Sequence, residues 1–155
     1  MCLICERIKM IQNNTNPYLV KELETGYVVI GDDQYFKGYT LFLCKKHVTE
    51  LFLLEDDFRK KFMDEMSTVA HAVAIVTGCD KMNYELLGMG DAHLHWHLYP
   101  RYRGDLEPYA KIGPVWWVPL DVVRDEKYKI KGRELEDAKA KLKAVLEELL
   151  NKASC

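Results

Sequence analysis

The sequence predicts an α+β fold in which a mostly antiparallel sheet packs against one long helix and a C-terminal helix. Three observations support this class: short β-prone segments alternate with turn-forming residues, a long central segment has apolar residues at helical spacing, and a second helical pattern closes the chain. With 155 residues, of which 48% are hydrophobic, residues 1–155 are long enough to fold as one domain around a sizeable core.

The first predicted strands follow one another in the first third of the chain. A turn cluster at 13–17 precedes strands over 19–23 and 26–30. A second turn, Gly31-Asp32-Asp33, precedes a strongly β-prone strand over 39–44. Such short segments joined by tight turns are typical of antiparallel pairing.

Both helices are predicted from apolar residues that recur every three or four positions. The first spans 56–76, with Asp57 in its first turn and Gly78 as its stop signal. Its apolar residues are Phe58, Phe62, Met66, Val69, Val73 and Val76. The second spans 133–152, and its apolar residues are Leu135, Ala138, Leu142, Val145, Leu146 and Leu149.

Two further strands are predicted between the helices, over 83–87 and 92–99, with Pro100 ending the second. Trp116 and Trp117 lie between two prolines, and on a strand they would face opposite ways. Two interpretations of these tryptophans compete: they pack in the core, or one of them lies at the mouth of a site or at a subunit interface.

Composition excludes several classes of function. A net charge of -2 and an isoelectric point near 6.2 leave no basic surplus for a nucleic-acid polymer, although a local site can still bind a small anion. No apolar run approaches the roughly 20 residues of a membrane span, and no signal peptide is predicted. The odd count of five cysteines, without a secretory signal, predicts a cytoplasmic protein.

Three histidines alternate with three bulky apolar residues in the segment His93, Leu94, His95, Trp96, His97 and Leu98. Because side chains of a strand alternate between its two faces, the imidazoles are predicted to share one face, about 6.5 Å apart. Three interpretations compete: a polar face toward solvent, a three-histidine site for zinc or copper, and nucleophilic and acid catalysis at phosphorus.

The segment His93–Tyr99 resembles the signature of the histidine triad (HIT) family, in which three histidines alternate with apolar residues. The segment 100–102 continues the resemblance, and Asn83 stands where the family has an asparagine. Upstream, 37–43 and Lys46-His47 resemble the family's Gly-His-Thr-Leu and Lys-x-His segments. The resemblance covers about residues 2–105 and implies a HIT-like fold and activity on nucleotides.

The resemblance implies that His95 is the nucleophile that attacks the α-phosphorus of a nucleoside phosphoramidate or a dinucleoside polyphosphate, such as diadenosine tetraphosphate. A covalent nucleotidyl-histidine would form, and water would release a nucleoside monophosphate. His97 would stabilise developing charge or help to protonate the leaving group, and it favours a hydrolase over the transferase branch. Asn83 would act with the two histidines, either by donating to the phosphate or by orienting its neighbours. Backbone N–H groups around Gly88 and Gly90 would add donors to the phosphate.

Two positions depart from the family pattern. Many members have serine or threonine just before the triad, where this chain has Gly90-Asp91-Ala92, and Asp91 is expected to point away from phosphate. Members also have an acidic residue that binds the ribose hydroxyls. Gly31 stands closest to that position, and either Asp32 or Asp33 could take this role. We favour Asp32, which also suits an ordinary turn.

The resemblance also implies a structural zinc site formed by Cys2, Cys5, His47 and His93. Cys-x-x-Cys is a spacing used in zinc sites, and four protein ligands leave no open position for water. The competing interpretation is that the two cysteines are small buried apolar residues. Magnesium would arrive only together with a polyphosphate substrate.

The family also implies a homodimer whose sheet continues across the subunits. Two rival functions stay open from the sequence. One is a nucleotide-binding protein with little or no turnover, supported by the departure at Asp91. The other is a metalloenzyme that uses the three histidines at one metal.

Overall fold

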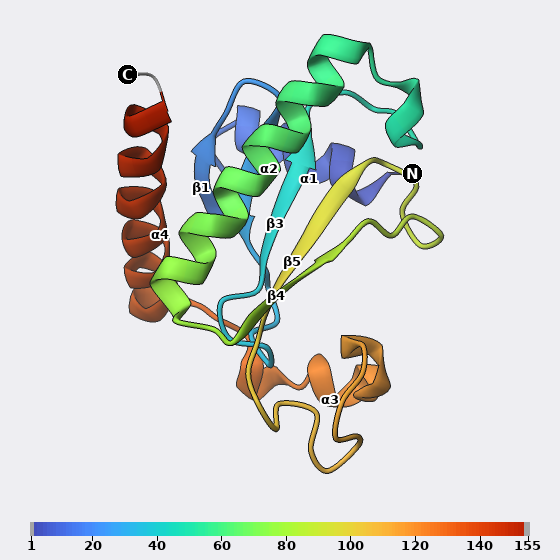
Figure 1. Ribbon diagram of the computed structural model, residues 1–155, viewed down its shortest axis with the longest axis vertical. Helices are drawn as coiled ribbons and strands as arrows, with labels where there is room; N and C mark the ends of the chain where they lie inside the picture. The colour runs from blue at the N-terminus through green and yellow to red at the C-terminus, as the bar shows by residue number, and fades with distance from the viewer. Residues whose placement is uncertain (1, 154–155) are drawn as a thin grey trace.

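The structure is a computed structural model that describes residues 2–153, and its centre is one five-stranded sheet. The strands are ordered β1-β2-β3-β5-β4, and every neighbouring pair is antiparallel (Figure 1). Their bounds are β1 Leu19–Glu22, β2 Gly26–Ile30, β3 Thr40–Cys44, β4 Lys81–Glu85 and β5 His95–Arg101. The predicted α+β class is therefore confirmed.

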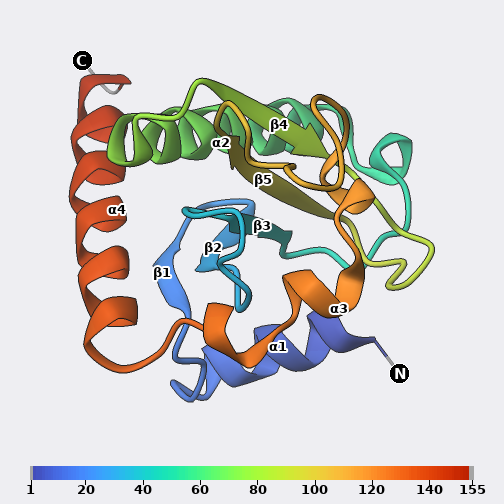
Figure 2. The same ribbon diagram turned by 90° about the horizontal axis from the view of Figure 1, so that it is seen from below.

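Helices cover both faces of the sheet. The two long helices, α2 (Asp56–Thr77) and α4 (Gly132–Ala153), contact each other, and α4 flanks the sheet edge at β1. On the opposite side lie α1 (Leu3–Gln12) and the short α3 (Leu120–Val123), as Figure 2 shows. No helix within residues 2–153 is long and apolar enough to cross a membrane.

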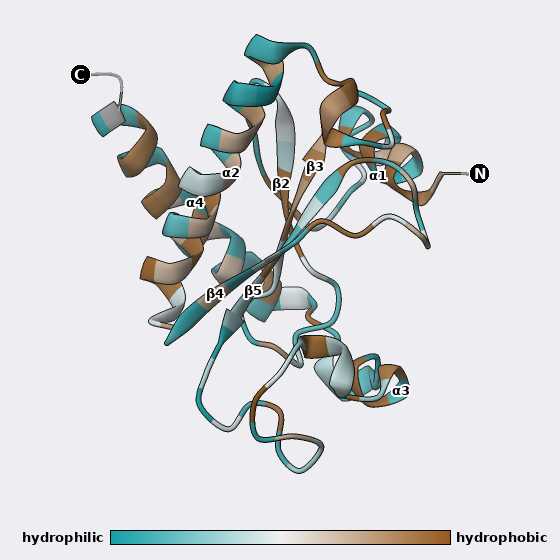
Figure 3. Cartoon of the chain, turned by 45° about the vertical axis from the view of Figure 1, so that its right-hand side comes forward, coloured by the Kyte–Doolittle hydropathy of each residue, from teal (hydrophilic) through white to brown (hydrophobic). Residues whose placement is uncertain are grey.

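The main core lies between the sheet and the two long helices. Each helix buries the apolar stripe predicted for it, and Figure 3 shows the mixture of apolar and hydrophilic residues along α4. Gly78 ends α2 in the left-handed conformation at φ 61°, as its predicted stop role requires. The most buried members of this core include Val28, Phe42, Phe62, Val69, Leu98 and Leu146.

A second core lies under α1, which the sequence analysis did not predict. Ile4, Ile8 and Ile11 form one buried helix face and pack against alternate residues of the central strands. These strand residues are Tyr27, Val29, Leu41 and Leu43. Because helices cover β2 and β3 on both sides, every residue of these two strands is buried.

Several predicted boundaries were wrong. The strand predicted over 83–87 begins and ends two residues earlier, at 81–85. The strand predicted over 92–99 instead begins at His95. It continues through Pro100, which can stay in the strand because the ladder with β3 ends at Leu98 and only β4 pairs with Pro100.

Trp116 and Trp117 are not on a strand. They belong to a 3-10 turn over Val115–Trp117, and their exposed fractions are 57% and 55%. Only Val115 of this turn is buried, in a small core with Phe36 and two other residues. Core packing of the two tryptophans was therefore the wrong interpretation.

Candidate active site and metal centre

The last two histidines of the triad line a cavity of about 530 Å³ between the sheet and α1. His95 and His97 lie on β5, opposite Leu43 and Leu41 of β3. Leu94, Trp96 and Leu98 instead enter the core beneath α2, as the predicted alternation requires. The cavity is lined by Leu3, Ile4, Arg7, Val29, Asp32, Asp33, Tyr39, Leu41, Leu43, Leu87, Gly88, Gly90, Asp91, His95, His97 and Arg124.

His95 is held in one tautomer by the backbone. Its Nδ1 lies 2.5 Å from the carbonyl oxygen of His93, and the imidazole is 5% exposed. A carbonyl oxygen only accepts hydrogen bonds, so Nδ1 carries the proton and donates it. Nε2 of His95 therefore carries the free lone pair, and this is the nitrogen that can act as a nucleophile.

His97 lies next to His95, with ring centroids 4.6 Å apart and ring planes at 61°. Its Nδ1 is 2.6 Å from the hydroxyl of Tyr39. Burial lowers the pKa of His97 from 6.5 to about 4. His97 is therefore a neutral imidazole at physiological pH.

Asp32 lines the cavity, and its carboxylate is already engaged. Arg7 of α1 donates from Nη1 to Oδ1 at 2.8 Å and from Nη2 to Oδ2 at 2.6 Å. This bidentate pair fixes the carboxylate geometry and raises the pKa of Arg7. Any ribose hydroxyl that Asp32 binds must share its oxygens with Arg7.

Of the other residues predicted near the phosphate, the two glycines line the cavity and Asn83 does not. Gly88 and Gly90 line the cavity, and a Cβ at either would meet no atom within 4 Å, so packing does not demand glycine there. Asp91 Oδ2 accepts a hydrogen bond from the Ile4 amide at 3.1 Å, in the first turn of α1. Asn83 lies on β4 opposite Tyr99 and is not among the cavity-lining residues.

The four predicted metal ligands form one cluster beside this cavity. Their sulfur and nitrogen atoms all lie within 4.8 Å of one another. Cys5 Sγ is 3.1 Å from His47 Nδ1 and 3.4 Å from His93 Nδ1, and the two imidazole nitrogens are 3.1 Å apart. Cys2 Sγ is 3.7 Å from His93 Nδ1. Tetrahedral zinc with sulfur and nitrogen ligands needs ligand separations of about 3.3–3.8 Å. These four separations, 3.1–3.7 Å, lie within a few tenths of an ångström of that range, so small shifts of the side chains fit the donor set to this ion.

His93 is oriented for this cluster rather than for the cavity. Its Nε2 donates to the carbonyl oxygen of Cys44 at 2.7 Å, which leaves the lone pair on Nδ1, toward the two cysteines. A backbone acceptor that fixes the tautomer of a histidine is the usual outer-shell partner of a metal ligand. The geometry thus separates His93 from His95 and His97 and does not favour one metal held by all three.

Sequence reasoning missed three polar side chains of the cavity: Arg7, Tyr39 and Arg124. The apolar spacing of α1 would have placed Arg7 on a helix, and Tyr39 stands out because the family segment has histidine there. Arg124 follows α3 and is exposed, with no ion pair recorded within residues 2–153. No local pattern marks Arg124 as a site residue.

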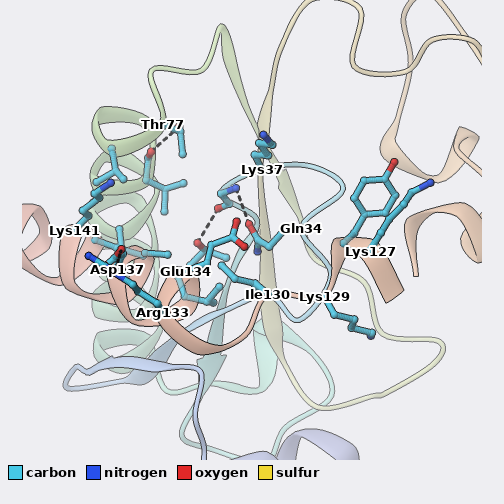
Figure 4. A pocket seen from close by; sticks show the side chains of 18 residues that line it. Gln34, Lys37, Thr77, Lys127, Lys129, Ile130, Arg133, Glu134, Asp137 and Lys141 are labelled. Atoms are coloured by element: carbon cyan, nitrogen blue, oxygen red, sulfur yellow. Dashed lines mark hydrogen bonds and ion pairs between the residues drawn. The ribbon is translucent and has the colours of Figure 1, made fainter. Parts of the chain in front are cut away.

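A larger cavity, of about 830 Å³, lies apart from the histidines. It opens between the end of α2, the start of α4 and the segment before β3, and none of the predicted site residues lines it. Its rim carries both signs of charge, as Figure 4 shows for Lys37, Lys127, Arg133, Lys141, Glu134 and Asp137. The candidate chemistry is therefore confined to the smaller cavity.

An antiparallel sheet that presents two adjacent histidines to a cavity, with the third turned into a cysteine–histidine cluster, defines a histidine triad protein. Comparison of the sequence with known families agrees, because residues 13–104 match the HIT domain family. The chain belongs to this family, whose members are in general nucleotide-binding proteins or hydrolases.

Individual relatives are consistent with this assignment. A HIT-like protein of Methanocaldococcus jannaschii is 31% identical over 137 residues, which span 85% of this chain and all of that protein. A crystal structure of a histidine triad protein from Marinobacter aquaeolei superposes with a TM-score of 0.68 at 25% identity, covering 84% of this chain and 89% of that one.

A zinc-bound histidine triad family protein from Mycobacterium smegmatis shares the fold, with a TM-score of 0.63 at 18% identity. The match covers 97% of this chain and 96% of that one.

Proposed function

We propose that this protein hydrolyses nucleoside phosphoramidates or dinucleoside polyphosphates at the α-phosphorus, with His95 as the nucleophile. The observation that carries the proposal is the hydrogen bond from His95 Nδ1 to the His93 carbonyl, which leaves Nε2 with a free lone pair in a buried, cavity-lining imidazole. A site of this kind activates a nucleophile by fixing its tautomer and orientation.

In the first step, Nε2 of His95 attacks the α-phosphorus and forms a P–N bond, while the bond from phosphorus to the leaving group breaks. The positive charge that develops on the imidazole is stabilised through Nδ1–H and the His93 carbonyl. His97, adjacent and neutral, donates a hydrogen bond to a phosphoryl or leaving-group oxygen. The departing group takes its proton from solvent water, while His95 keeps its own proton on Nδ1.

In the second step, water attacks the nucleotidyl-histidine, the P–N bond breaks and a nucleoside monophosphate is released. His95 returns to its neutral tautomer with the proton on Nδ1. The apolar wall formed by Val29, Leu41 and Leu43 suits a nucleobase, and Asp32 with Arg7 offers hydrogen bonds to a ribose. Magnesium enters only as a companion of polyphosphate substrates, and no step is assigned to it.

We further propose that Cys2, Cys5, His47 and His93 hold a structural zinc ion. The support is the compact donor set, the tautomer of His93, and a zinc-bound relative of the same fold. Zinc would join the start of α1 to the segments before β5 and after β3, and so stabilise one wall of the cavity.

The test of the hydrolase proposal is release of nucleoside monophosphate from diadenosine tetraphosphate and from adenosine 5′-phosphoramidate, by the wild type and by His95→Ala. The wild type should turn over at least one substrate, and the variant should lose at least about a thousandfold in kcat, because its nucleophile is gone. His71→Ala, on the exposed surface of α2, is the matched control.

Equal turnover by the wild type and a folded His95→Ala protein would remove the mechanism. Tight nucleotide binding without turnover would instead favour the binding-protein alternative.

A further inference from the structure

We propose that Tyr39 is a positioning residue that holds His97 in the tautomer with its proton on Nε2. His95 and His97 then present opposite groups to the cavity, a lone pair from the first and an N–H from the second. Only the catalytic consequence of this arrangement rests on the proposed hydrolase function, because the tautomer is a property of the free protein.

The contact between the two side chains is short and well supported. The Tyr39 hydroxyl lies 2.6 Å from His97 Nδ1, across the β3–β5 edge of the cavity. The phenol ring is parallel to that of Tyr99, with centroids 4.2 Å apart and planes at 5°. This stack limits movement of the phenol ring, so its hydroxyl stays within hydrogen-bond distance of His97 Nδ1.

Burial keeps both the phenol and the imidazole neutral, so one of them donates its proton to the other in this hydrogen bond. Burial raises the pKa of Tyr39 well above 10, so its hydroxyl keeps the proton and can donate it. His97 has a pKa of about 4 and is neutral, with one acceptor nitrogen and one N–H. If the phenol donates to Nδ1, the imidazole proton must be on Nε2.

The arrangement gives two neighbouring histidines complementary roles. His95 donates from Nδ1 to a backbone carbonyl, so its cavity-facing nitrogen is a nucleophile. His97 accepts at Nδ1 from Tyr39, so its other nitrogen is a donor for a phosphoryl oxygen. A neutral imidazole donor is suited to developing negative charge on a phosphoryl oxygen, and it places no positive charge beside the nucleophile.

The position of the Tyr39 ring requires a glycine at position 31. A Cβ built on Gly31 would lie 2.1 Å from the Tyr39 ring, which is too close for any side chain. Gly31 is also the position closest to the acidic residue expected from the family pattern, and Tyr39 stands where that pattern has histidine. The two departures are therefore coupled, because the tyrosine occupies the space that an acidic side chain at Gly31 would need.

The experiment is a two-dimensional ¹⁵N–¹H spectrum of the histidine rings at neutral pH, recorded on the substrate-free, zinc-loaded protein. In the wild type, His97 should show a protonated Nε2 and an unprotonated Nδ1. Tyr39→Phe keeps the ring and removes the donor, so His97 should change to a mixture of tautomers. Tyr99→Phe keeps the Tyr39 hydroxyl and should retain the wild-type pattern.

Turnover gives the second measurement. Tyr39→Phe should lower kcat by about tenfold to a hundredfold with a much smaller change in KM, because the lost donor acts on developing charge. Gly31→Ala should produce the same spectral change by displacing the phenol, and this variant tests the contact without altering Tyr39.

A wild-type spectrum with the proton on Nδ1 of His97, or a tautomer that persists in Tyr39→Phe, would overturn the inference. So would a change of tautomer in Tyr99→Phe as large as that in Tyr39→Phe. If the spectra agree with the inference but the wild type hydrolyses neither substrate, the hydrolase proposal fails and the role of Tyr39 in fixing the tautomer stands.

Discussion

At the scale of single residues, the least expected group is Glu85 on β4. Its side chain is 9% exposed, its Oε2 has no hydrogen-bond partner within the described residues, and it lies cross-strand from His97. Burial raises its pKa from 4.5 to about 7, and the nearby charge of Arg101 only partly offsets this effect. Glu85 is thus a carboxyl group that the fold holds at an energetic cost.

This cost predicts a pH-dependent stability. Between pH 4.5 and about 7 the unfolded chain releases the Glu85 proton while the folded protein retains it, so the group destabilises the fold increasingly as pH rises. Glu85→Gln should raise the free energy of unfolding by about 1–3 kcal/mol at pH 8 and by much less at pH 5, measured by urea denaturation.

Glu148→Gln, at an exposed position of α4, is the matched control and should change stability by less than about 0.5 kcal/mol at either pH. A gain for Glu85→Gln that is equal at pH 5 and pH 8 would contradict the assigned cause.

At the scale of elements, the sequence predicted the long helices and most strands but not the wall of the cavity that α1 forms. The patterns of α2 and α4 repeat over five turns or more, so their periods are unambiguous. The segment of α1 has only 10 residues, so Ile4, Ile8 and Ile11 repeat too few times to distinguish a helix by period alone.

Side-chain partners were beyond the reach of pattern analysis. Tyr39 and His97 are 58 positions apart, and Arg7 and Asp32 are 25 apart, so only the folded sheet brings them together. The pairing of His93 with Cys2 and Cys5 was predicted from family resemblance and not from spacing.

Zinc should stabilise α1 more than any other helix. Cys5→Ser, or a strong chelator, should lower the zinc content from about one ion per chain to near zero and speed hydrogen exchange in Leu3–Gln12, with α4 unchanged. The melting temperature should fall by about 2–4 °C for each kcal/mol lost.

Cys79→Ser lies outside the cluster and is the control for thiol loss, because it should retain the metal. Zinc that persists when both Cys2 and Cys5 are replaced would instead support the three-histidine metal site.

At the scale of the whole molecule, β4 is the free edge of the sheet, whereas α4 flanks the edge at β1 (Figures 1 and 2). Unpaired backbone groups on an edge strand pair readily with a second strand. Tyr84 on this edge is 47% exposed. We therefore expect a homodimer in which β4 pairs with its counterpart.

Light scattering after size exclusion should give twice the chain mass of 18.1 kDa. Tyr84→Lys, which places like charges at the two-fold contact, should weaken the dimer by about tenfold or more. Ile75→Lys on α2, at an equally exposed apolar position, should leave it intact. A wild-type protein with the mass of one chain would refute the dimer.

The cavity combines residues of the family-matched segment with a few residues from outside it. His95 and His97 lie inside residues 13–104, the part that matches the family, whereas Leu3, Arg7 and Arg124 lie outside it. Because Arg7 of α1 holds the carboxylate of Asp32, a relative with a different N-terminal segment would present a different wall to the same two histidines. Under the proposed function, exchange of this segment between relatives is a direct test of its influence on the choice of substrate.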